Sequence, residues 1–407
     1  MRFKMAEVVT TDSSLAWRRL TVAMALGTVG GVGMWSVVVV LPAVQAEFGI
    51  DRAAATMPYT LTMLGFAVGG LLMGRLADRI GIVPPLILGT LCLALGYGLS
   101  ALATSLWQFA LAHGVLVGAL GSSVAFGPLM ADVSRWFRRR RGLAVALCAS
   151  GNYLAGTLWP PVVEHGVHAY GWRATQAGIG LFCLAAMLPL ALLMRGRAPP
   201  APSTRAAGRQ AGLALSPSAI QGLLVVAGIA CCVAMAMPQV HIVAYCSDLG
   251  YGVAQGAQML SLMLGFGIVS RIASGFVADR IGGLATLLAG ALLQAAALAL
   301  YLAFDDLTSL YVISALFGLF QGGIVPAYAI IVREYLPAEE AGARIGAVLM
   351  ATLAGMALGG WLTGVIFDAT GSYHAAFLNG LAWNAVNVAI VLWLLHCRRP
   401  RTALAAI

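Results

Sequence analysis

The stretch Gly265–Gly282 reads G-F-G-I-V-S-R-I-A-S-G-F-V-A-D-R-I-G and carries the strongest signal in the chain. It is apolar enough to cross a bilayer, yet it holds one guanidinium, Arg271, eight residues before Asp279. At about 1.5 Å per helical residue, Arg271 lies roughly 12 Å inside the hydrocarbon, where a cation costs at least ~2.5–3.5 kcal/mol. No Asp or Glu occupies the middle of any apolar segment. We therefore expect Arg271 to bind an anionic substrate; the alternative is a structural arginine that pairs with backbone carbonyls.

The composition around this stretch is that of a membrane protein. Of the 407 residues, 60% are hydrophobic and 10% are charged, against about 25% charged residues in soluble domains. The net charge of +9 does not indicate nucleic acid, because the basic residues fall in short loops on one side of the membrane. The apolar run after residues 1–18 is too long for a signal-peptide core, so we expect an uncleaved N-terminus. The low fraction of charged residues therefore predicts that most of the protein surface contacts membrane lipid.

Twelve apolar segments follow one another, and each is long enough to cross a hydrocarbon core of about 30 Å. They lack the period-2 alternation of barrel strands, so an all-α membrane protein with twelve transmembrane helices is predicted. The predicted segments are 20–44, 55–76, 83–104, 107–131, 143–163, 174–194, 217–246, 255–277, 284–304, 307–332, 343–366 and 375–396.

The distribution of basic residues predicts the orientation. With the N-terminus inside, 21 of the 24 Lys and Arg residues, Arg19 among them, fall at cytoplasmic segment ends. Only Arg52 and Arg173 fall on the opposite side. This bias predicts a multi-pass protein of the cytoplasmic (inner) membrane with both termini in the cytoplasm.

A polar linker at 195–216 divides the segments into an N-terminal half, 1–194, and a C-terminal half, 217–407. Both halves carry a similar short motif, which reads G-R-L-A-D-R-I-G from Gly74 and, 201 residues later, G-F-V-A-D-R-I-G from Gly275. Such repetition predicts two pseudo-symmetric six-helix bundles.

The repeated text resembles the G-x-L-a-D-R-x-G signature of the major facilitator superfamily. The resemblance implies a secondary-active transporter that works by alternating access, neither an enzyme nor a cofactor protein. It also implies that the charged turns can pair with the facing bundle and so gate access; the alternative is a tight loop held by Gly and charge. The gating residues that it implies are Asp78, Arg79, Asp279 and Arg280.

Finer motifs are similar to the monocarboxylate transporter and oxalate/formate antiporter families. They are G-S-S-V-A-F-G-P at 121–128, W-F-R-R-R-R-G-L-A at 136–144, G-W-R at 171–173, and D-x-x-G-S-Y at 368–373. The resemblance implies that Arg271 is the substrate-anion residue. Oxalate carriers add a lysine in the eleventh segment, and 343–366 contains none. Because one buried cation suits one carboxylate better than two, we favour a monocarboxylate such as lactate or pyruvate.

Polar and aromatic side chains inside the apolar runs are candidates to complete the substrate site, with ordinary interhelical packing as the alternative. They are Tyr328, Gln321, Asn152, Tyr153, Tyr59 and Trp35. His241 and His113 are candidates to carry a coupling proton, although a neutral hydrogen-bonded histidine is the commoner case. Proton symport, anion exchange and facilitated diffusion therefore all stay open.

The remaining patterns argue against other classes. Glu164, His165 and His168 have a metal-like spacing at a helix end, but no further ligand is evident, so no metal is expected. An oxalate/formate-type exchanger is one rival. A multidrug exporter usually needs an embedded acid, a membrane receptor or sensor needs a signalling domain, and an integral-membrane enzyme needs a catalytic constellation; none of these features is evident. We expect a monomer that binds a small carboxylate and, under proton symport, a proton.

Overall fold

The computed structural model describes residues 11–196, 213, 215–337 and 340–398. Its elements are helices of which η1 is π-helical and η2 is a 3₁₀ turn. They are α1 (Ser14–Gly30), α2 (Val32–Phe48), α3 (Arg52–Ile80), α4 (Val83–Ala101), α5 (Leu106–Leu111), η1 (Ala112–Gly121), η2 (Ser122–Ala125), α6 (Gly127–Trp136), α7 (Arg141–Leu193), α8 (Pro217–Asp248), α9 (Val253–Ile281), α10 (Gly283–Ala303), α11 (Leu307–Gln321), α12 (Ile324–Tyr335), α13 (Ala341–Thr370) and α14 (Tyr373–His396).

The described residues contain eleven helical stretches that are long and apolar enough to cross a membrane. One of them, α7, has 53 residues and is roughly 80 Å long if straight, more than twice the hydrocarbon thickness. Its helical path is broken at Gly171, whose φ of 78° is a value that glycine adopts readily. Since α7 turns back there, it supplies both predicted segments 143–163 and 174–194. The prediction of an all-α membrane protein with twelve crossings is confirmed.

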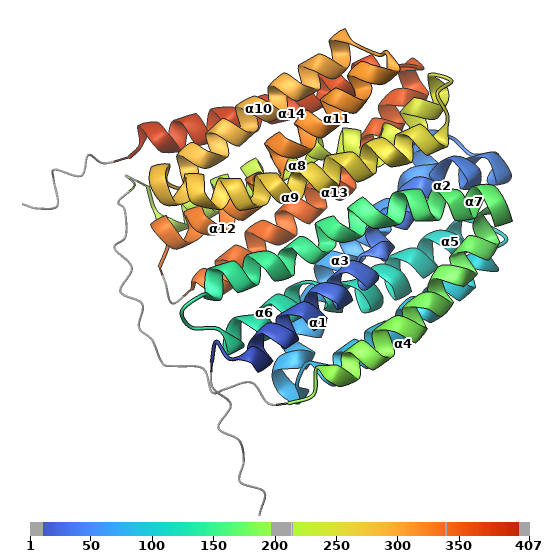
Figure 1. The fold of residues 1–407 in the computed structure, drawn as a ribbon. Coiled ribbons are helices and arrows are strands. Elements are labelled where there is room, and N and C mark those ends of the chain that lie inside the picture. The colour runs from blue at the N-terminus through green and yellow to red at the C-terminus, as the bar shows by residue number, and fades with distance from the viewer. Residues whose placement is uncertain (1–10, 197–212, 214, 338–339, 399–407) are drawn as a thin grey trace, which may run out of the picture.

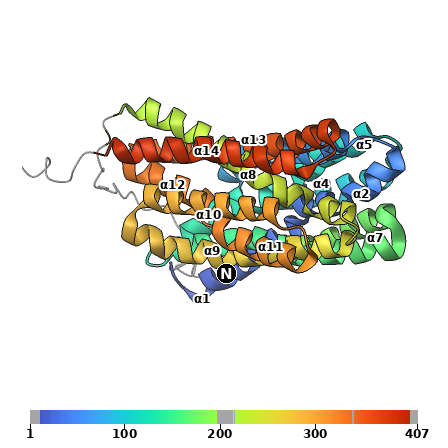
Figure 2. The same ribbon diagram turned by 90° about the horizontal axis from the view of Figure 1, so that it is seen from above.

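The two halves of the chain lie on two sides of the molecule. In Figure 1 the blue-to-green helices α1–α7 gather on one side and the yellow-to-red helices α8–α14 on the other. Figure 2 shows the same helices running roughly parallel to one another. Because the crossings are even in number, α1 begins and α14 ends at one end of the molecule, here called the terminus side; the other end is the distal side. The predicted linker 195–216 lies largely outside the described residues, so its boundaries stay a prediction.

Small residues let helices inside each half approach closely. A Cβ on Gly69 of α3 would lie 1.9 Å from the carbonyl oxygen of Ala119 in η1, and one on Gly65 would lie 2.1 Å from that of Gly114. Close backbone approach of this kind holds helices together where lipid provides no hydrophobic force between them. The π-helical part of the fourth crossing is therefore fixed against α3 by glycines four residues apart.

Replacing Gly69 with Ala is expected to destabilise the protein, because the added methyl meets a backbone carbonyl that cannot move aside. Overpacking of this kind costs about 1–3 kcal/mol. Gly70→Ala is the matched control, since a Cβ there meets nothing within 4 Å. Thermal unfolding of the purified variants in detergent measures the difference. Equal melting temperatures for the two variants would contradict the packing described here.

Candidate functional site

Two crossings are interrupted at corresponding positions of the two halves. In the C-terminal half α11 ends at Gln321 and α12 begins at Ile324. In the N-terminal half the fourth crossing changes from π-helix to 3₁₀ turn after Gly121, which lies 201 residues before Gly322. Interrupted transmembrane helices expose backbone carbonyls and helix ends at membrane depth, and transporters use such breaks to bind their cargo. The candidate site is therefore sought beside these breaks.

Arg271 of α9 lies beside the break in the tenth crossing. Its Nε is 3.5 Å from the carbonyl oxygen of Gly322, and its Nη1 is 3.4 Å from that of Ala149 in α7. Good N–H···O bonds cluster near 2.9–3.0 Å, so both contacts are long and weak. Its Cζ lies 4.2 Å from the ring centroid of Tyr153, at cation–π distance. Within the described residues no carboxylate forms an ion pair with Arg271, which leaves most of its donor capacity for an anion.

The N-terminal half contributes three of the predicted residues to this neighbourhood. Trp35 of α2 donates its indole N–H to the backbone carbonyl of Asn152, at 3.2 Å. The Oδ1 atom of Asn152 is buried and has no hydrogen-bond partner in the described part of the chain. The next residue, Tyr153, carries the ring that faces Arg271. Trp35, Asn152, Tyr153 and Arg271 thus form a continuous set across the boundary between the halves.

The other predicted binding residues are held in different surroundings. Gln321 is buried directly before Gly322, and neither of its amide atoms has a partner in the described structure. The Tyr328 hydroxyl donates to Oδ1 of Asn387 on α14, at 2.9 Å and within the C-terminal half. Tyr59 of α3 packs against the backbone of Gly360 in α13. Gln321 alone of these three adjoins a residue that Arg271 contacts.

Both histidines are buried and have partners in their own halves. His113 of η1 lies between the rings of Tyr97 and Phe109, at 5.7 and 4.5 Å, and its Nε2 is 3.3 Å from the Gln176 amide nitrogen. The Nε2 of His241 is 2.9 Å from the carbonyl oxygen of Gly360. These contacts place neither imidazole against the Arg271 guanidinium, and the coupling role of both stays a prediction.

The charged turns lie on the terminus side. Asp78 accepts a hydrogen bond from Arg135 of α6, in its own half. Asp78 and Arg79 line a cavity of about 1450 Å³ that reaches Gly342 near the start of α13. Of the described residues that line this cavity, Gly342 alone belongs to the C-terminal half, so the cavity separates the charged turn from that half. The second pair is exposed at the end of α9 and consists of Asp279 and Arg280.

Sequence reasoning missed a buried ion pair near this cavity. Arg19, counted above among the loop charges, is only 5% exposed. Its Nε and Nη2 donate to the two carboxylate oxygens of Asp132, at 2.7 and 3.0 Å. The guanidinium also lies over the Trp136 ring, 4.5 Å from its centroid. A signal existed in the position of Asp132, one residue past the fourth predicted segment, but pairing it with Arg19 requires the topology.

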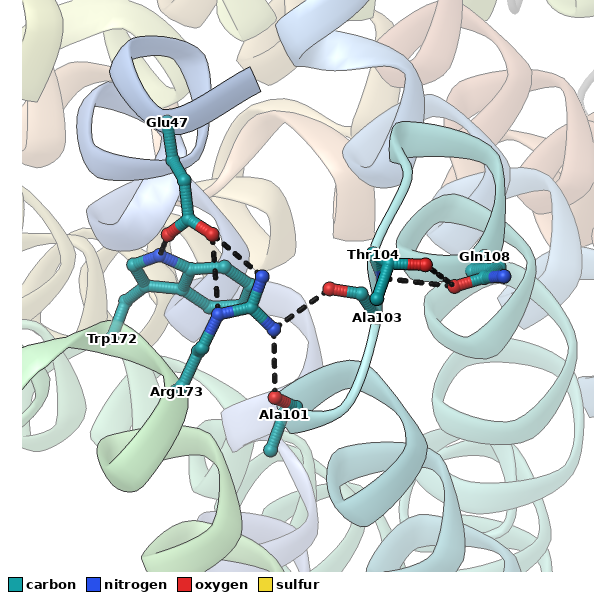
Figure 3. Close-up of polar contacts among 7 residues, drawn as sticks. All are labelled: Glu47, Ala101, Ala103, Thr104, Gln108, Trp172 and Arg173. Atoms are coloured by element: carbon teal, nitrogen blue, oxygen red, sulfur yellow. Dashed lines mark hydrogen bonds and ion pairs between the residues drawn. The ribbon is translucent and has the colours of Figure 1, made fainter.

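The G-W-R motif forms a second missed arrangement, here called the distal staple and made of Glu47, Trp172 and Arg173 (Figure 3). Arg173 donates to Glu47 at 2.6 Å and to the carbonyl oxygens of Ala101 and Ala103 at 2.9 and 2.7 Å. Trp172 donates its indole N–H to the same carboxylate. The staple therefore ties α2, the end of α4 and the second part of α7 together on the distal side, all within the N-terminal half.

The metal-like pattern Glu164, His165 and His168 lies on α7. Among the described residues no three His, Cys, Asp or Glu side chains are grouped so that they could hold a metal ion.

Comparison with known proteins gives consistent results. The family model of the Major Facilitator Superfamily matches residues 23–304 and 274–406. Monocarboxylate transporter 13 of Bos taurus is 27% identical over 358 residues, which cover 87% of this chain and 83% of that protein. An MFS-type transporter of Gibberella moniliformis is 28% identical over 361 residues, which cover 84% of this chain and 86% of that protein. The solved structure of a bacterial homolog to the human lysosomal transporter Spinster, in an inward-facing and unoccupied conformation, matches with a TM-score of 0.69 at 15% identity. The match covers 95% of this chain and 96% of that chain, and this likeness shows the fold alone.

Proposed function

The chain belongs to the major facilitator superfamily, and we propose that this transporter carries a small monocarboxylate of the lactate or pyruvate type across the cytoplasmic membrane. The observation that carries the proposal is the Arg271 guanidinium, which has two long carbonyl contacts and no carboxylate partner in the described structure. Similarity to monocarboxylate transporter 13 of two mammals, Bos taurus and Rattus norvegicus, supports the same class of cargo.

The geometry suggests how one carboxylate binds. A planar guanidinium donates two parallel N–H bonds to a carboxylate, and such charge-assisted bonds are shorter and stronger than those to a neutral carbonyl. An incoming carboxylate would therefore displace the weak contacts of Arg271 with Ala149 and Gly322. The unpartnered Oδ1 atom of Asn152 and the two amide atoms of Gln321 are available to polar groups of the cargo, and the Tyr153 and Trp35 rings to its apolar part.

The position of the site also suggests how binding is linked to access. Arg271 belongs to the C-terminal half, while Ala149 and Tyr153 belong to the N-terminal half. Relative motion of the halves must therefore change the surroundings of the guanidinium, as alternating access requires. In the proposed orientation the terminus side faces the cytoplasm, so the cavity on that side would open to the cytoplasm.

An oxalate/formate-type exchanger is the second candidate. A dicarboxylate calls for a second cation near the first, because an unpaired carboxylate in a low-dielectric site is costly. The eleventh crossing, α13, contains one basic residue, Arg344, and its side chain pairs with Glu340 at the terminus end. This arrangement favours the monocarboxylate.

The test is uptake of labelled carboxylates into liposomes that contain the purified protein. Lactate and pyruvate are expected to enter and to compete with each other, whereas oxalate is expected to compete poorly. Imposed pH gradients, with and without a protonophore, separate proton symport from exchange and facilitated diffusion. Empty liposomes are the control. Uptake of oxalate in preference to every monocarboxylate would overturn the proposal.

A further inference from the structure

Three charged residues join the two halves on the distal side. The Arg52 side chain, at the start of α3, donates from Nη2 to both carboxylate oxygens of Asp248 at the end of α8, at 3.1 and 2.9 Å. Asp368, near the end of α13, accepts from the backbone N–H groups of Arg52 and Ala53, at 2.9 and 2.7 Å. We name Arg52, Asp248 and Asp368 the distal latch.

The latch lies in a closely packed contact. Arg52 is only 7% exposed, and its guanidinium lies 4.9 Å from the ring centroid of Phe367 on α13. A Cβ on Gly364 would lie 2.8 Å from Cα of Ala53, so α13 and α3 touch backbone to backbone. A carboxylate is favoured at a helix N-terminus, where N–H groups are free and the helix dipole is positive. Asp368 of one half thus caps a helix of the other.

The two halves differ in the partner of the carboxylate at this position of the repeat. Glu47 lies 201 residues before Asp248, the same offset as between the two charged turns. Glu47 is held inside its own half by Trp172 and Arg173, as Figure 3 shows. Gly171 and Gly371 both have a positive φ, of 78° and 66°, and lie 200 residues apart. Two residues after them, the N-terminal half has Arg173 and the C-terminal half has Tyr373. The ion pair of Asp248 is made with Arg52 of the opposite half instead.

We propose that the distal latch is the gate that holds the distal side closed in this state and that its contacts break when that side opens. Its residues are positioning residues, since they lie at helix ends away from Arg271. The latch is incomplete as it stands, because Nε and Nη1 of Arg52 are buried without partners in the described structure. Buried donors without partners weaken the closed state, and such a contact can be broken and remade during each transport cycle.

The test measures distances between spin labels on the full-length protein in liposomes, without substrate. One label pair replaces Tyr170 and Phe304, which are 76% and 50% exposed at the distal ends of the two halves. A second pair replaces Ile80 and Ile281 on the terminus side, 54% and 47% exposed. Cys92 and Cys397 are first replaced by Ser, because the other five cysteines are buried.

Asp248→Asn and Asp368→Asn are each expected to at least double the population with a long distal distance and to shorten the distance on the terminus side. Glu47→Gln, the same change at the matching position of the other half, is expected to leave both distances as in the parent protein. The charge exchange Arg52→Asp with Asp248→Arg should restore the closed distal distance.

Unchanged distal distances in both asparagine variants would overturn the gate, as would an equal shift in Glu47→Gln. Because no substrate enters this experiment, its outcome is independent of whether the cargo is a monocarboxylate.

Discussion

Arg271→Ala is expected to reduce carboxylate uptake into liposomes to about a fifth of the wild-type rate or less at substrate concentrations near KM. Hydrogen bonds to charged groups contribute about 1.5–3 kcal/mol, which corresponds to roughly a tenfold to hundredfold loss of affinity. Arg271→Lys keeps the charge but loses the planar fork, so it should transport measurably yet with a raised KM. Initial rates of labelled lactate and pyruvate uptake against concentration give both values.

Arg333→Ala is the matched control for this experiment. It removes an exposed arginine of the same half and is expected to leave KM unchanged. A normal size-exclusion profile for Arg271→Ala shows that lost uptake is not lost folding. Carboxylate uptake at the wild-type rate and KM in Arg271→Ala would contradict the assignment of Arg271 to the cargo and would favour the structural role, an arginine bonded to carbonyls.

Asp132→Ala is expected to destabilise the protein by about 3–5 kcal/mol, because it leaves the buried Arg19 cation without its partner. The pair is bidentate, and Arg19 is only 5% exposed, so water cannot replace the lost carboxylate easily. Thermal unfolding in detergent, followed by intrinsic tryptophan fluorescence, measures the loss. The same experiment on Arg19→Met should show a comparable fall, since it leaves Asp132 unpaired.

The double variant Arg19→Met with Asp132→Leu tests whether the two side chains stabilise the protein as a pair or each contributes independently. Replacing both members of a buried ion pair by apolar residues is often neutral or stabilising. The double variant is therefore expected to recover most of the lost melting temperature. Arg18→Ala, one residue away and exposed, serves as the control and should change little. Additive losses in the double variant would contradict the description of this pair.

Most of the architecture follows from hydropathy and length. Segments of about 20 apolar residues must form helices in lipid, and the repeated text that starts at Gly74 and Gly275 predicts the two bundles. The reversal inside α7 was predicted by the two separate segments 143–163 and 174–194, between which polar residues interrupt the apolar run. The structure adds that the helical path is broken at Gly171. These features depend on local sequence alone.

The latch and the buried ion pair could not be predicted in the same way. Arg52 and Arg19 look like ordinary loop charges, and their partners lie 196 and 113 residues away in the chain. Which helix ends meet depends on how the bundles pack, and hydropathy does not contain that information. Asp368 was noted in a motif, but its role as a cap on α3 appears only once α13 lies beside that helix.

The same limit applies to the candidate binding residues. Tyr328 and Tyr153 were both predicted as aromatic residues in apolar runs. The structure turns the Tyr153 ring toward Arg271 and the Tyr328 hydroxyl toward Asn387. Helical phase and the choice of neighbouring helix decide between these outcomes.

The most direct test of the central claim compares binding of lactate and of its neutral amide, lactamide, to the wild type and to Arg271→Ala by titration calorimetry. If Arg271 binds the carboxylate, the wild type prefers lactate by at least about tenfold and the variant loses that preference, while lactamide binds both proteins alike. A preference for lactate that is unchanged in Arg271→Ala would show that the carboxylate is bound elsewhere.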